Sequence, residues 1–172
     1  MAITLYEATV PNFLQVLGGI RGVLDKGLAH ARDTGVDPDS LLEWRLAEDM
    51  FPFARQVLLT AKHSAGALAD VRDGAFSFPK FDAVGYAGLQ AAIAQAEAEL
   101  REWTPEAINA LEGKDVRFEV PSASRVFKAE AFLFSFSTPN FYFHGVTAYD
   151  ILRAKGVPVG KMDYLAGIRT AL

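Results

Sequence analysis

The sequence predicts an all-α protein: an up-down four-helix bundle with a small β-hairpin inserted before the last long helix. Two observations carry this prediction. Apolar residues recur with helical period in four separate stretches, and they alternate with period two in a single stretch. The chain has 172 residues, of which 51% are hydrophobic, so it can bury one sizeable core. We therefore expect one domain over residues 1–172.

The four helical stretches are expected near residues 3–34, 49–74, 83–103 and 129–155. Pro11 predicts a kink or a restart in the first stretch, and Pro139 predicts a kink in the last. The second stretch is expected to begin with Asp49 as its cap and Pro52 in its first turn. A further short helix is predicted at the sequence PDSLLEW, between the first two stretches.

Residues 115–128 break the helical rhythm. Val116, Phe118 and Val120 alternate with charged residues, as in a strand with one buried face. A turn is predicted at Pro121–Ser124, after which a second apolar run resumes. We expect a β-hairpin at about 115–128.

Composition excludes several classes of function. The net charge of −4 and a pI near 5.4 argue against a nucleic-acid partner, because no phosphate-neutralising surface is implied. The absence of cysteine rules out disulfides, thiolate nucleophiles and cysteine-based zinc sites. No uninterrupted run of about 18 apolar residues predicts a membrane span, and the amino terminus lacks a basic segment before an apolar run. We expect a cytoplasmic protein.

Two segments carry a family resemblance: AEDMFPFARQV and PNFYFHGVTAYDILRAKGVPVGKMDYL. With them, the chain resembles a bacterial family known as a domain of unknown function, within the DinB-like, YfiT-type superfamily of four-helix-bundle proteins. The resemblance covers nearly the whole chain and implies a bundle fold and a tendency to dimerise. Metal-binding members use one histidine on the second helix and a His-x-x-x-His pair on the fourth. Some of them transfer groups to low-molecular-weight thiols.

The resemblance places His144 at the second histidine of the fourth-helix pair, but Asn140 stands at the first. His63 lies on the second predicted helix. By helical angle, His144 and Asn140 share an inward face with Leu133, Ala148 and Ile151, so we expect both to be mostly buried. The first interpretation is a hydrogen-bonded polar pair that packs in the core, and the second is a pocket for a small ligand.

His63 lies about 140° from the apolar stripe of its own helix, which contains Val57, Ala61 and Leu68. We therefore expect His63 to be exposed and away from His144. Catalytic zinc usually takes three protein ligands, so no metal site and no cofactor are expected. His63 and His144 are the only weak candidates for metal ligands.

Three hypotheses about function remain open. The first is a small-ligand-binding protein or degenerate enzyme with Asn140, His144 and Tyr149 as ligand-binding residues, and His144 as the candidate catalytic group. The second is a metal-dependent hydrolase or thiol-group transferase, as the superfamily implies. The third is a non-catalytic dimeric structural or interaction protein. In each case we expect a homodimer, without nucleic-acid or membrane partners.

Overall fold

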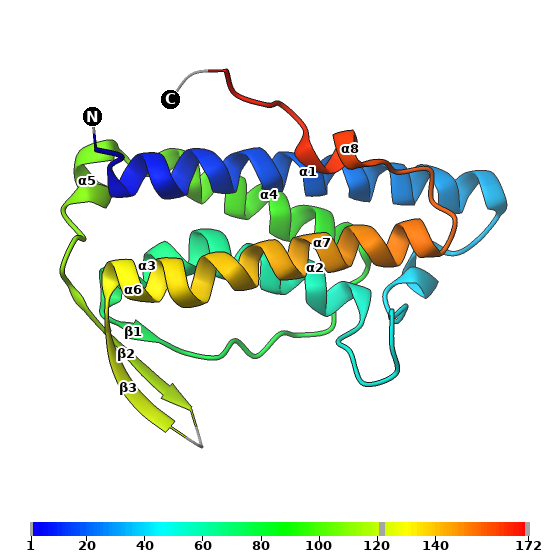
Figure 1. Cartoon of the computed structure of the whole chain (residues 1–172). Coiled ribbons are helices and arrows are strands. Elements are labelled where there is room, and N and C mark those ends of the chain that lie inside the picture. The colour runs from blue at the N-terminus through cyan, green and yellow to red at the C-terminus, as the bar shows by residue number, and fades with distance from the viewer. Residues whose placement is uncertain (1, 121–122, 171–172) are drawn as a thin grey trace.

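Four long helical segments build most of the protein (Figure 1). The computed structural model describes residues 2–120 and 123–170. The first segment is α1, Leu5–Thr34, and the third is α4, Tyr86–Glu102. The second and fourth segments are each interrupted by one π-helical turn. The second joins α2 (Phe53–Ala61), η2 (Lys62–Gly66) and α3 (Ala67–Asp73); the fourth joins α6 (Ala129–Phe132), η3 (Leu133–Ser137) and α7 (Thr138–Ala154).

Helix α1 runs without a restart through Pro11, contrary to one of the two expectations for that residue. The side-chain amide nitrogen of Asn12 donates hydrogen bonds to the backbone carbonyl oxygens of Glu7 and Ala8, at 3.4 and 2.9 Å. The carbonyl of Glu7 is the one that Pro11, having no N–H, leaves without its helical donor. Thr4 and Glu7 form a capping box at the start of α1, which satisfies further free backbone groups there.

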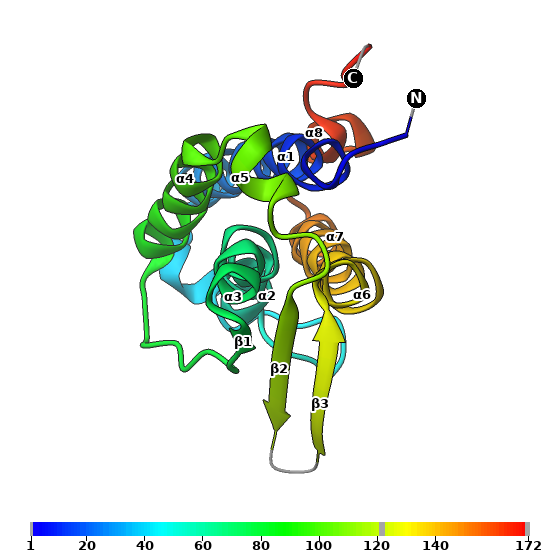
Figure 2. The same cartoon turned by 90° about the vertical axis from the view of Figure 1, so that its left-hand side faces the viewer.

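The second segment occupies the middle of the molecule. Viewed end-on, α2 and α3 lie between α4 on one side and α6 and α7 on the other, with α1 above them (Figure 2). Buried residues therefore point in several directions, toward α1, α4 and α7, rather than along one stripe. The helix begins at Phe53, not at Asp49 as predicted, and ends at Gly74 in the left-handed conformation.

A small three-stranded sheet extends from one end of the helices. Strands β2 (Asp115–Val120) and β3 (Ala123–Lys128) pair antiparallel, which confirms the predicted hairpin. A third strand, β1 (Ala75–Phe76), pairs parallel to β2 and was not expected from the sequence. The predicted turn at Pro121–Ser124 falls partly on residues 121 and 122, which lie outside the described residues.

Three short helices complete the chain: η1 (Pro38–Leu41), α5 (Pro105–Asn109) and α8 (Lys161–Leu165). The helix expected at PDSLLEW is shorter than predicted, since only η1 forms there. Helix α8 lies directly against α1 (Figure 1), at a point where a side chain on Gly19 would collide with the backbone of Tyr164. Within the described ranges, no helix is long and apolar enough to span a membrane. The cytoplasmic location stays a prediction.

Candidate functional site

Two buried histidines meet at the centre of the molecule, one from each interrupted segment. His63 lies in η2 and His144 in α7, and the two residues are only 3% and 6% exposed. The ring centroids are 5.8 Å apart and the ring planes differ by 15°. We call these two residues the histidine pair. The burial of His144 agrees with the expectation from sequence. The predictions that His63 is exposed and that it lies away from His144 are both wrong.

The error for His63 has two physical causes. Its helix is surrounded by neighbours, so a residue opposite one apolar stripe is still covered. In addition, His63 lies inside a π turn, where the fixed rotation per residue of an α-helix does not apply.

A chain of two hydrogen bonds orients His144. The amide nitrogen of Gln56 donates to the backbone carbonyl of Phe51 at 3.1 Å, so the amide oxygen of Gln56 faces the other way. That oxygen lies 2.7 Å from Nδ1 of His144. Because an amide oxygen only accepts, Nδ1 of His144 must carry the proton. The neutral ring therefore presents Nε2 as an unprotonated acceptor.

His63 is held by a weaker polar contact and by aromatic rings. Its Nδ1 lies 3.4 Å from the hydroxyl oxygen of Ser137, a residue of the other π turn. The ring also packs against Phe76 at 6.2 Å and edge-on against Phe136 at 5.4 Å. The His63–Ser137 contact thus joins η2 to η3, so the two π turns lie next to each other.

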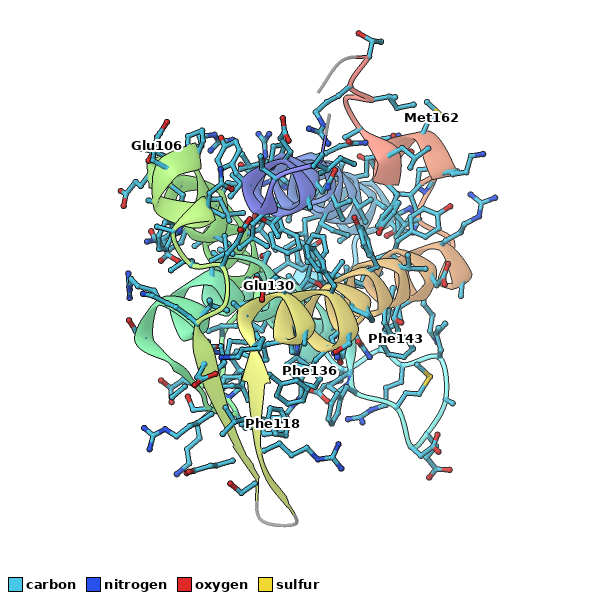
Figure 3. The ribbon with its side chains drawn as sticks, turned by 60° about the vertical axis from the view of Figure 1, so that its left-hand side comes forward. Glu106, Phe118, Glu130, Phe136, Phe143 and Met162 are labelled. Atoms are coloured by element: carbon cyan, nitrogen blue, oxygen red, sulfur yellow. The ribbon has the colours of Figure 1, made fainter. Side chains whose placement is uncertain are left out.

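Aromatic side chains continue from the pair toward the hairpin and along α7. Phe118, Phe136 and Phe143 follow one another on this side of the molecule (Figure 3). Phe136 meets Phe118 edge-on at 5.1 Å, and Phe143 meets the His144 ring edge-on at 5.4 Å. Phe143 is 55% exposed, so the aromatic surroundings of the pair reach the surface.

The Nε2 atoms of the pair are free. Neither makes a hydrogen bond with any described residue, since the only bonds of both rings involve Nδ1. Neither belongs to the fully buried polar atoms that lack a partner in the described part of the chain. Each Nε2 therefore keeps some contact with solvent.

Both imidazoles are neutral at physiological pH. Burial, with smaller contributions from His144 and Lys62, lowers the pKa of His63 from 6.5 to about 4. Burial, with a smaller contribution from Arg55, lowers the pKa of His144 from 6.5 to about 4. The cause is the same for both, because a charged ring loses its hydration in the interior. Such weak bases accept hydrogen bonds but take up protons poorly at pH 7.

Asn140 and Tyr149, the other two predicted ligand-binding residues, are half-buried and make contacts with other residues. The side-chain amide of Asn140, which is half-buried, donates to the carbonyl oxygen of Phe136 at 2.7 Å. Asn12 makes the same bond to the residue four positions before it, and both asparagines directly follow a proline. Tyr149 is half-buried, and its ring lies 6.2 Å from that of Tyr164.

The donor set does not fit the metal group that the superfamily implies. Residues 2–120 and 123–170 contain no cluster of three or more His, Cys, Asp or Glu side chains able to hold a metal ion. At the third position stands Asn140, whose neutral amide is not among the usual zinc ligands Cys, His, Asp and Glu. The charged groups that act on the two rings, Lys62 and Arg55, are both cations, and these would repel a metal ion.

Sequence reasoning did not identify Gln56 and Ser137 as partners of the histidines. Gln56 is 1% exposed between the buried residues Phe53 and Val57. A polar residue inside an apolar stripe must find a partner in the core, and this position was the available signal. Ser137 gave no comparable signal.

Comparison with known proteins places the chain in a family. Residues 5–165 match the family described as Domain of unknown function (DUF1993). The chain belongs to the DUF1993 family. Among solved structures, it is similar to the crystal structure of a DinB family member protein from Shewanella denitrificans. The two share 31% sequence identity, the match covers 98% of this chain and 95% of that chain, and the TM-score is 0.83.

None of the curated proteins matches the DUF1993 chain. The match over nearly its full length confirms the DinB-like resemblance inferred from the sequence.

Proposed function

We propose that this DUF1993 protein is an up-down four-helix bundle that binds a small molecule at the histidine pair, as a degenerate relative of metal-dependent DinB-like enzymes. The observation that carries the proposal is the pair of free Nε2 atoms. Each ring is anchored through Nδ1, and each Nε2 has no hydrogen-bond partner among residues 2–120 and 123–170 but keeps some contact with solvent. Buried polar atoms normally find partners within the fold, so two unused ring nitrogens favour an external partner.

The chemistry of the pair defines the ligand. The Gln56 contact makes Nε2 of His144 an acceptor, so the ligand must offer an O–H or N–H group there. The surrounding rings of Phe76, Phe136 and Phe143 suit an apolar or aromatic body. We therefore propose an uncharged, donor-bearing aromatic or apolar molecule, with Asn140 and Tyr149 as outer members of its site.

Metal-dependent hydrolase or thiol-group transferase chemistry is the second candidate. One observation favours it: metal-binding histidines also anchor one ring nitrogen on a protein acceptor, as His144 does on Gln56. The missing third ligand and the two nearby cations disfavour it. Metal analysis of protein purified without an affinity tag separates the candidates. A stoichiometric transition metal would overturn the proposal of a degenerate site.

Binding at the pair is tested with phenol, which can donate a hydrogen bond, and with anisole, which has the same ring but no donor. We expect phenol to shift the amide and imidazole NMR signals around residues 63 and 144, and anisole to shift them at least several-fold less. The variant His144→Phe keeps a planar ring without the acceptor and should lose the phenol response. His30→Phe is the matched control on α1 and should retain it.

Equal responses to phenol and anisole would contradict a site defined by acceptor nitrogens. A phenol response that survives in His144→Phe would place the binding elsewhere in the protein.

A further inference from the structure

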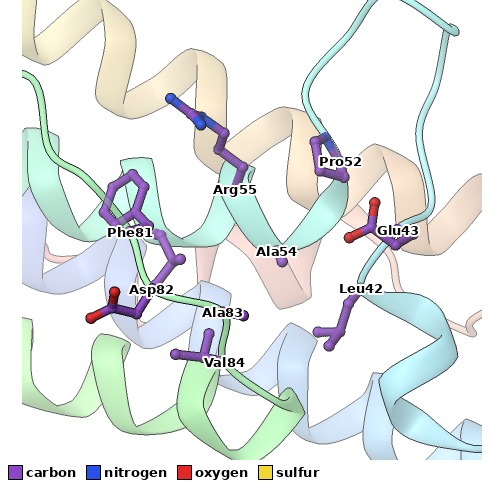
Figure 4. Close-up of a pocket in the computed structure, with 10 residues that line it drawn as sticks. Leu42, Glu43, Pro52, Ala54, Arg55, Phe81, Asp82, Ala83 and Val84 are labelled. Carbon is purple, nitrogen blue, oxygen red and sulfur yellow. The ribbon is translucent and has the colours of Figure 1, made fainter.

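A cavity lies on the opposite side of α2 from α7. Its volume is about 340 Å³, within the range of small-molecule sites. It is bounded by the segment after η1, by the first turns of α2 and by the loop that leads into α4 (Figure 4). We call it the α2 pocket. From this geometry we infer that the α2 pocket binds a small amphipathic amine, with an apolar body and a cationic head group.

The walls of the α2 pocket are fixed by hydrogen bonds. The N–H groups of Phe53 and Ala54 donate to the carbonyl oxygens of Trp44 and Leu42, at 2.8 and 3.0 Å, and tie the segment after η1 to α2. On the other side, Asp39 accepts a bond of 2.7 Å from the N–H of Tyr86, which ties the start of α4 to η1. The pocket is therefore formed before any ligand arrives, which lowers the cost of binding.

The lining of the pocket is mainly apolar and carries charge at its edges. The apolar wall consists of aliphatic and proline side chains: Leu42, Pro52, Ala54, Leu58, Ala83 and Val84. The charged lining residues are Glu43, Asp82 and Arg55, which give a net charge of −1. Figure 4 shows the Glu43 carboxylate and the Arg55 guanidinium at opposite ends, with the guanidinium directed away from Ala54.

Two features favour an amine over a carboxylate in this pocket. The N–H groups of Phe53 and Ala54, at the start of α2, are already used by carbonyl oxygens, so these two of the first-turn donors are not available to an anion. Arg55, the one cation in the lining, lies over the ring of Phe51 at 4.4 Å and near that of Phe81 at 5.9 Å. Its guanidinium is therefore held at aromatic faces, at the opposite end of the pocket from the Glu43 carboxylate.

Two carboxylates remain for a cationic head group. Asp82 makes no ion pair with a described residue, and Glu43 has only an exposed partner, Arg45, at 3.2 Å. An ammonium group can replace Arg45 beside Glu43 while the body of the ligand covers the apolar wall.

The experiment titrates the full chain with 2-phenylethylamine and follows the amide signals by NMR. Two matched compounds share the ring and differ in the head group: 3-phenylpropionate is an anion and 2-phenylethanol is neutral. We expect the amine to shift the signals of residues 42–44, 52–58 and 81–84, and to bind more tightly than either control. Stronger binding of the propionate, or no shifts with about 10 mM amine, overturns the inference.

Two sets of variants test the site directly. The double variant Glu43→Gln, Asp82→Asn should weaken amine binding about three- to fivefold, the loss expected for partly exposed charge pairs. Ala83→Leu fills the cavity and should abolish binding, whereas Ala87→Leu on the exposed face of α4 should leave it unchanged. Thermal unfolding checks that each variant is folded. Amine binding that survives Ala83→Leu in a folded protein overturns the inference.

Discussion

At the scale of single residues, the polar partners of the histidine pair decide its chemistry. The amide oxygen of Gln56 accepts a hydrogen bond from Nδ1 of His144, and its amide nitrogen donates one to the carbonyl of Phe51, which fixes the orientation of the amide. His144 could be placed in the core from its sequence position, because an i, i+4 pattern of apolar residues surrounds it. Its protonation state could not, since Gln56 is 88 residues away in the chain and only the packing of α2 on α7 brings the two together.

Replacing Gln56 tests this relay, by which we mean the two successive hydrogen bonds from His144 to Gln56 and from Gln56 to Phe51. In Gln56→Glu we expect the pKa of His144 to rise, because a carboxylate in contact with the ring favours its charged form. In Gln56→Leu the Nδ1 proton loses its acceptor, and we expect the protein to lose about 1–3 kcal/mol of unfolding free energy. Nitrogen NMR shifts of the imidazole report the tautomer and its titration. A His144 ring that remains wholly in the Nδ1–H form in Gln56→Leu would contradict the relay.

The depressed pKa values of the pair predict a pH-dependent stability. In the folded chain both rings stay neutral down to about pH 4, whereas in the unfolded chain they take up protons near pH 6.5. The unfolded state therefore binds more protons between these values, and stability falls as pH is lowered from about 6.5 to about 4. We expect roughly 1–3 kcal/mol per imidazole over this window.

Urea unfolding at several pH values measures this effect. The double variant His63→Gln, His144→Gln should show a shallower loss of stability below pH 6.5 than the natural chain. His30→Gln, the control, should keep the slope of the natural chain. Parallel slopes for the double variant and the natural chain would show that the pair is not the source.

At the scale of elements, the two π turns place the site residues. Turn η2 carries His63 and turn η3 carries Ser137, and the two side chains are in contact. The positions of the long helices could be predicted from the helical period of their apolar residues. Their ends could be predicted from local signals such as the terminating glycines Gly35 and Gly74. Helical period could not reveal a π turn, because no residue type is required there. The direction of His63 was therefore beyond what the sequence alone could give.

Deleting one residue from η2 tests its role. A π turn contains one residue more than the α-helix that would replace it, so removing Gly66 should leave the flanking helices α2 and α3 in place. We expect the variant to fold cooperatively and to lose the His63–His144 ring contact. Deleting Ala94 from α4 is the control. It rotates the following residues by about 100°, which moves the buried Ala96 and Leu100 out of the core.

Circular dichroism and urea unfolding compare the two deletions. The Gly66 deletion should cost roughly 1–3 kcal/mol, the usual range for a local change, and the Ala94 deletion should cost more or prevent folding. Equal losses would mean that η2 is no more tolerant of deletion than a regular helix.

At the scale of the whole molecule, helix positions and the hairpin follow from sequence period, because both rest on contacts between residues close in the chain. The parallel pairing of β1 with β2 joins residues about 40 positions apart in sequence, Ala75 with Arg117. A strand of two residues has no period to detect, so the third strand appears only once α3 has brought its end beside the hairpin. The α2 pocket has the same origin, since its walls come from three separate segments.

The expected homodimer belongs to this scale, and the exposed face of α7 is where we propose that it forms. Phe143 and Val146 are 55% and 39% exposed and lie three residues apart, so they share one face of the helix. A stable dimer through this face should bury more than about 1,000 Å² in total, and a charge placed within that area would remain unpaired and desolvated. We therefore expect Val146→Glu to convert the protein to a monomer at tens of micromolar in sedimentation velocity. Val126→Glu, on the exposed hairpin strand β3, should leave the dimer intact. A natural chain that sediments as a monomer at these concentrations would remove the proposal, and a dimer that tolerates Val146→Glu would move the interface to another face.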